Sequence, residues 1–130
     1  MKKFLLSAIL SLVTVSGFAE TDYFMTTQLK FYNGYDWVWS PGGDGIAVAV
    51  NYGTSTISIN SQKFQIFSLF NDSPWHWNQS GHREFTANAY DEDGHQCYIR
   101  IVERNDDEGP LQMYFHYSNV NYVYSMFPVQ

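Results

Sequence analysis

The sequence contains one cysteine in 130 residues. A single cysteine cannot form a disulfide within the chain, so packing rather than cross-linking must hold the fold together. Cys97 lies in the alternating segment HQCYIRIVER, on the same side as Ile99 and Ile101. We therefore expect a buried, unreactive thiol.

Basic residues are also scarce. The chain has seven lysines and arginines against thirteen acidic residues, and Lys2 and Lys3 lie in the leader discussed next. Without them five basic residues remain against thirteen acidic ones, which is a formal charge of −8. This balance excludes nucleic acid and anionic membrane surfaces as favoured partners and leaves basic or neutral ones.

Long apolar runs are absent after the first twenty residues. The N-terminus reads MKKFLLSAILSLVTVSGFAE, with an apolar run over 4–15 and small residues at 17 and 19. This is the pattern of a secretory signal peptide (1–19) cut after Ala19. The run is shorter than the ~20 residues of a membrane-spanning helix. We expect one exported domain (20–130), secreted or periplasmic, with no transmembrane segment after cleavage.

Helical periodicity is missing as well, whereas alternation with period two recurs between turn-forming clusters. The sequence predicts an all-β fold, a small antiparallel meander barrel of about eight strands like that of the lipocalins, with a two-sheet β-sandwich as the alternative. The expected strands are 25–31, 46–51, 56–60, 63–69, 83–90, 95–104, 111–117 and 122–127.

The connections favour pairing of neighbouring strands. DEDG (91–94), NDDEGP (105–110) and SNVN (118–121) are turn sequences of the kind that close hairpins. In a meander such turns alternate between the two barrel ends. The segments 51–55, 71–82 and 105–110 should therefore meet at one end, and 91–94 should lie at the other.

The C-terminal half also shows a resemblance. YDEDGHQCYIRIV, LQMYFHY and NYVYSMF, within residues 83–127, are similar to small exported bacterial β-domains that carry a lone cysteine and aromatic-rich closing strands. The resemblance implies a fold and no activity.

The sequence offers no convergent catalytic or metal-binding set. The acidic clusters 91–93 and 106–108 are expected at opposite ends, too far apart for paired acid and base work. The four histidines, His76, His82, His95 and His116, have no zinc-ligand spacing. A calcium loop from Asp91 would need a glutamate where Val102 stands. We expect no enzyme activity, no metal and no cofactor.

The segment NDSPWHWNQSGH (71–82) is the candidate site, predicted as a loop. Aromatic faces beside polar groups suit a ligand, although the indoles could instead fold inward and plug the barrel. The Trp37 and Trp39 pair is expected to pack in the core or on a face of the sheet. The candidate ligand-binding residues are Trp75, His76, Trp77, Gln79, His82, Tyr52, Thr54, Asp106 and Asp107.

These features predict a binding domain for a glycan, a peptide or a small apolar molecule. The alternative is a proteinaceous inhibitor of an exported cysteine peptidase, because such inhibitors are compact exported barrels that present a loop. An outer-membrane barrel is disfavoured because most expected strands are shorter than ~9–11 residues.

Overall fold

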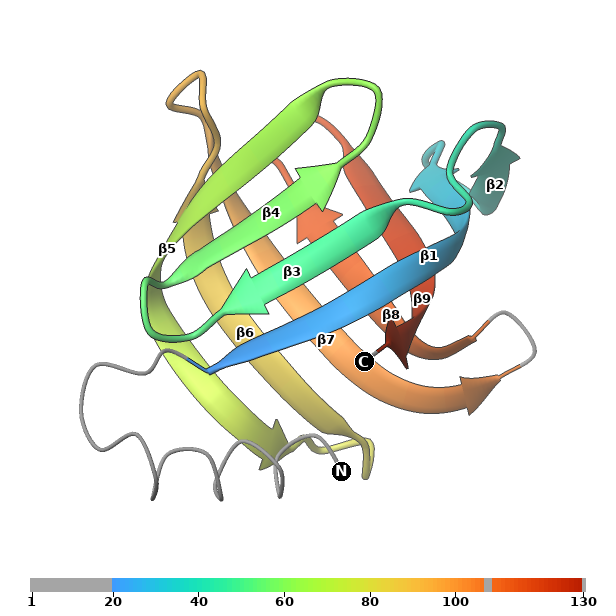
Figure 1. Cartoon of the computed structure of the whole chain (residues 1–130). Coiled ribbons are helices and arrows are strands. Elements are labelled where there is room, and N and C mark those ends of the chain that lie inside the picture. The colour runs from blue at the N-terminus through green and yellow to red at the C-terminus, as the bar shows by residue number, and fades with distance from the viewer. Residues whose placement is uncertain (1–19, 107–108, 130) are drawn as a thin grey trace.

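The protein is a closed antiparallel β-barrel (Figure 1). The computed structural model describes residues 20–106 and 109–129, and for residues 105 and 106 it describes the backbone alone. The expected signal peptide lies outside this range. The strands are β1 (Thr21–Tyr32), β2 (Trp37–Ser40), β3 (Ala47–Asn51), β4 (Thr56–Asn60), β5 (Phe64–Trp77), β6 (Arg83–Tyr90), β7 (Gln96–Asp106), β8 (Gly109–His116) and β9 (Asn121–Val129).

Eight strands form the barrel wall in chain order, and β1 closes it. β1 pairs with β3 along one edge and with β9 along the other, where Tyr23 lies opposite Val129 and Phe31 opposite Tyr122. The short β2 is an extra strand on the far part of β1. The predicted meander barrel is therefore confirmed over the sandwich.

Alternation fills the barrel interior with apolar side chains. Ile99, Ile101, Met113 and Phe115 are all fully buried, and Phe67 crosses the interior to pack with its ring centroid 5.0 Å from that of Phe115. Burying each such side chain contributes about 1.5–3 kcal/mol to stability. The interior is therefore a packed apolar core.

Cys97 belongs to this core. Its side chain faces the interior with 3% of its surface exposed, and burial raises the pKa of the thiol to about 11. The prediction that this cysteine is buried is confirmed.

The prediction that residues 71–82 form a loop is wrong. β5 continues to Trp77 and pairs with β6, so that His76 lies opposite Glu84, and only residues 78–82 form the turn. Two register shifts, between Phe70 and Ser73 and between Ser73 and His76, absorb the polar segment, and Asn71 has a positive φ of 51°. Such bulges let a strand bend and continue where its sequence reads as a loop.

Of the two packings predicted for Trp37 and Trp39, neither residue lies in the core, and Trp37 packs on the outer face of the sheet. They lie in β2, paired with the end of β1, and are 38% and 61% exposed. Trp37 packs its ring 5.3 Å from Tyr32 and 5.8 Å from Tyr114 on the outer surface. A short edge strand has no second layer to cover it, so alternation there does not mean burial.

The expected sorting holds for the turns that the structure describes fully. Lys63 and Asp91, from two connections of one end, line a shared cavity of about 100 Å³, while Tyr52 and Trp75 meet at the other end.

Within the part of the chain that the structure covers, there is no helix whose length and apolarity would carry it through a bilayer.

Candidate functional site

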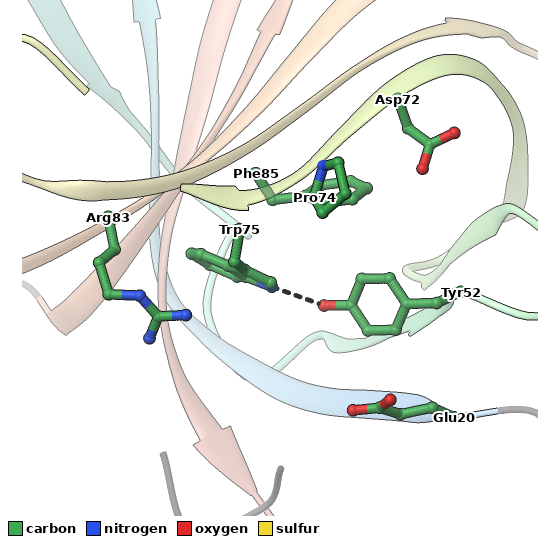
Figure 2. Close-up of a pocket in the computed structure, with 7 residues that line it drawn as sticks. All are labelled: Glu20, Tyr52, Asp72, Pro74, Trp75, Arg83 and Phe85. Atoms are coloured by element: carbon green, nitrogen blue, oxygen red, sulfur yellow. Dashed lines mark hydrogen bonds between the residues drawn. The ribbon is translucent and has the colours of Figure 1, made fainter. Parts of the chain in front are cut away.

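A cavity of about 410 Å³ opens at the barrel end where β1 begins and β5 ends (Figure 2). This volume lies within the roughly 300–1,000 Å³ typical of small-molecule sites. We call it the mouth pocket. Its lining residues come from the position before β1, the β3–β4 turn, the far half of β5 and the start of β6: Glu20, Tyr52, Asp72, Pro74, Trp75, Arg83 and Phe85.

Trp75 forms one wall of the mouth pocket. It is half-buried and packs against the core, with its ring 6.3 Å from that of Phe85. The guanidinium of Arg83 lies over the indole, 5.3 Å from its centroid. In Figure 2 the ring lies between Arg83 and Tyr52. The indole is thus held on both sides while part of its surface faces the pocket.

A hydrogen-bond chain fixes this wall from beneath. The Nε1–H of Trp75 donates to the Tyr52 hydroxyl at 3.0 Å, and that hydroxyl donates to Oδ2 of Asp22 at 2.8 Å. Asp22 is fully buried on the inner side of β1. Burial, and then the charge of Asp22, raise the pKa of Tyr52 far above its ordinary value, so its hydroxyl keeps its proton. The two aromatic walls are therefore preorganised.

The charged groups of the mouth pocket are mostly acidic. Glu20 and Asp72 line it with carboxylates, and the pKa of Glu20 is raised by burial and by the nearby charge of Asp22. Arg83 is the one cationic side chain in the described lining, and it also lies 3.7 Å from Oε1 of Glu103. A cationic group entering the pocket would meet an excess of negative charge.

Several predicted site residues lie elsewhere. His76 shares the outer side of the wall with Glu84: its Nε2 is 3.6 Å from Oε2 of Glu84, and its Nδ1 is 2.8 Å from the Pro74 carbonyl. Trp77 is 71% exposed and does not line the mouth pocket. The two tryptophans of the WHW segment thus have different environments.

The remaining predicted residues belong to turns or fall outside the described side chains. The Asn78 side chain accepts bonds from the backbone N–H of Ser80 and of His82, closing the turn that carries exposed Gln79. Thr54 bonds through its hydroxyl to that of Thr56 at 2.9 Å. The prediction for Asp106 and Asp107 cannot be placed, because their side chains lie outside the described range.

Sequence reasoning missed Glu20, Asp72, Pro74, Arg83 and Phe85. A signal existed for the last two, since the 83–90 alternation places Arg83 on the same inward side as Phe85 at the strand end. The other three come from segments whose position depends on how far β1 and β5 extend, which the local pattern does not encode.

The acidic turn at the opposite end has a structural role. Oδ1 of Asp91 accepts bonds from the backbone N–H groups of Asp93 and His95, and Oδ2 accepts one from the Tyr117 hydroxyl at 2.9 Å. Burial opposes ionisation of Asp91, but these bonds outweigh it and lower the pKa. Asp91 therefore ties this turn to the connection between β8 and β9.

Comparison with known proteins finds no matching family model, no matching curated protein and no matching solved structure.

Proposed function

We propose that this protein is an exported, non-enzymatic binding domain that takes a small amphipathic molecule at the mouth pocket. The observation that carries the proposal is the fixed aromatic wall of Trp75 and Tyr52 beside open space of about 410 Å³. Among the ligand classes expected from the sequence, a small apolar body fits this wall best, because Trp75, Phe85 and Pro74 supply flat apolar surface.

The charge of the pocket selects the polar group of that molecule. Glu20 and Asp72 offer two carboxylates, whereas Arg83 is already engaged with Trp75 and Glu103. A protonated amine would stabilise the ionised form of Glu20, which burial disfavours. The proposed ligand is therefore an apolar ring or short chain that carries a basic group, either a free amine or a basic peptide side chain.

Binding is favoured over catalysis by the chemistry of the pocket hydroxyl. The Tyr52 proton is committed to Asp22, and the raised pKa of Tyr52 makes it a poor proton donor or nucleophile at neutral pH. Its use here is to hold Trp75.

A matched series tests the proposal: phenylbutylamine, phenylbutanol and phenylbutyrate titrated into the mature protein, followed by tryptophan fluorescence and thermal shift. We expect the amine to bind most tightly. Trp75→Ala should weaken it at least about tenfold, a loss of about 1.4 kcal/mol, and Glu20→Gln with Asp72→Asn should remove the preference for the amine.

Trp77→Ala is the matched control, since Trp77 lies two residues along the same strand but outside the pocket. It should leave the affinity unchanged. Equal binding of all three compounds, or an equal effect of the two tryptophan variants, would contradict the proposal.

The cysteine-peptidase inhibitor is a second candidate, favoured by the hairpin between β1 and β2. Its turn carries Tyr35, which is 88% exposed, and the Asn33 side chain fixes the turn by accepting two backbone bonds. Figure 1 shows β2 at the margin of the barrel. Titration of papain should then give a stoichiometric loss of activity that Tyr35→Ala relieves; full papain activity at excess protein would rule this candidate out for that enzyme class.

A further inference from the structure

A second cavity, of about 270 Å³, lies beside β2 near the barrel end opposite the mouth pocket. It is lined in part by Thr27 and Gln28, at a bulge in β1. The pairing of β1 with β9 shifts register between Thr26 and Gln28, and at this point the other edge of β1 changes partner from β3 to β2. The loop between β2 and β3 fills the gap between these two partners. We call the cavity the Trp39 pocket.

Backbone contacts hold this loop in one place. Gly45 N–H donates to the Thr26 carbonyl at 2.8 Å, Thr26 N–H donates to the Ile46 carbonyl at 2.9 Å, and Ile46 N–H donates to the Thr26 hydroxyl at 2.9 Å. Gly43 lies so close to Leu29 that a Cβ there would be 2.7 Å from the Leu29 nitrogen. The loop is clamped onto β1, so the cavity is preformed.

Trp39 forms the apolar wall of the Trp39 pocket. Its backbone is fixed opposite Lys30, yet 61% of its surface is exposed. Exposure of a large indole on a fixed strand gains nothing for stability, and it leaves a flat face available to a ligand.

The other walls are polar. They present a hydroxyl from Ser40, an amide from Gln28 and a carboxylate from Asp44, and the backbone of Gly42, where no side chain obstructs approach. No cationic side chain lines the cavity within the described residues. An anionic ligand would meet the charge of Asp44 with no cation in the described lining to offset it, and a fully apolar ligand would cover the Asp44 carboxylate without hydrogen-bonding to it.

We propose that the Trp39 pocket binds one ring of a neutral saccharide. The C–H face of a sugar ring stacks on the indole, and the ring hydroxyls, which donate and accept, match Gln28, Ser40 and Asp44. The cavity is smaller than the roughly 300–1,000 Å³ of drug-sized sites. It therefore holds a single unit, and the rest of an oligosaccharide extends over the outer surface.

Calorimetry on the mature protein tests this with three neutral trisaccharides, cellotriose, maltotriose and triacetylchitotriose, and with trigalacturonate as the anionic comparator. We expect at least one neutral sugar to bind at concentrations below about 10 mM, a range in which weak single-ring contacts register. Trp39→Ala should weaken that binding at least about tenfold. Asp44→Asn, which keeps the shape and removes the charge, should weaken it less.

Trp77→Ala is the control for loss of an exposed tryptophan, and circular dichroism verifies that each variant is folded. Failure of all three neutral sugars to bind, preference for trigalacturonate, or binding that survives Trp39→Ala would overturn the inference. Binding that is lost in Trp75→Ala instead would assign the sugar to the mouth pocket, so the two proposals fail separately.

Discussion

At the scale of single residues, a side chain's partner determines its role more than its type does. Trp75 and Trp77 are identical in chemistry and lie two residues apart on one strand, but only Trp75 meets the Tyr52 hydroxyl. The meander argument predicted that residues 52 and 75 would meet, because alternate turns share an end. It could not predict Asp22 beneath them, since the sequence signals before residue 25 did not reveal where β1 begins.

Cys97 gives a prediction for alkaline pH. Burial raises its pKa from an ordinary 9.0 to about 11, so the folded state holds the proton more tightly than the unfolded state. Stability from this group is complete below pH 9 and is lost as the pH rises from 9 to 11. At roughly 1.4 kcal/mol for each pH unit, the loss amounts to at most about 3 kcal/mol.

Urea denaturation of the wild type and Cys97→Ala across this range measures the effect. Both proteins share the partly buried Tyr117 and Tyr122, whose raised pKa values also destabilise the fold at high pH, so the difference in slope reports the thiol together with its electrostatic coupling to these tyrosines. Parallel pH profiles for the two proteins would contradict the assignment.

At the scale of elements, alternation in the sequence predicted strands that have one face against the core. It did not predict strand segments without such a face. The strand 83–90 was predicted with its observed bounds, because Phe85, Ala87 and Ala89 alternate without interruption. β5 was cut short because Pro74 and its polar neighbours read as a loop, although pairing with β6 and two bulges carry the strand through. This pairing is that of a hairpin, but its two register shifts break the alternation by which the sequence would signal the strand.

The loop between β2 and β3 depends on Gly43. Gly43→Ala would place a methyl group against the Leu29 backbone, so β1 or the loop must move. Overpacking of this kind costs about 1–3 kcal/mol. We expect a lower midpoint in urea denaturation and weaker saccharide binding at the Trp39 pocket.

Ser80→Ala is a suitable control, because Ser80 is exposed and bonds to Asn78 through its backbone. It should unfold like the wild type. A Gly43→Ala protein as stable as Ser80→Ala would show that the close contact with Leu29 is easily relieved.

At the scale of the whole molecule, closure joins the two ends of the chain. β1 is paired with β9 from Tyr23 to Phe31, which leaves neither strand with a long open edge on that side. A chain ending at Val120 lacks β9 and would expose the edges of β1 and β8 together with the core. We expect it to show no cooperative thermal transition and no near-ultraviolet circular dichroism.

Adding a synthetic peptide of residues 121–129 should restore both signals in a concentration-dependent way, since the peptide supplies the missing wall. A truncated chain that unfolds cooperatively without the peptide would show that closure is not required for the packed core.

Closure by the first and last strands also sets the order of events during synthesis. The strand made first waits for the one made last, because the contacts between them span about a hundred residues of chain. The barrel therefore cannot close until β9 has left the ribosome, and the chain stays unfolded during translation. Under the export proposed above, this delay would give a translocation channel time to capture the chain before folding competes.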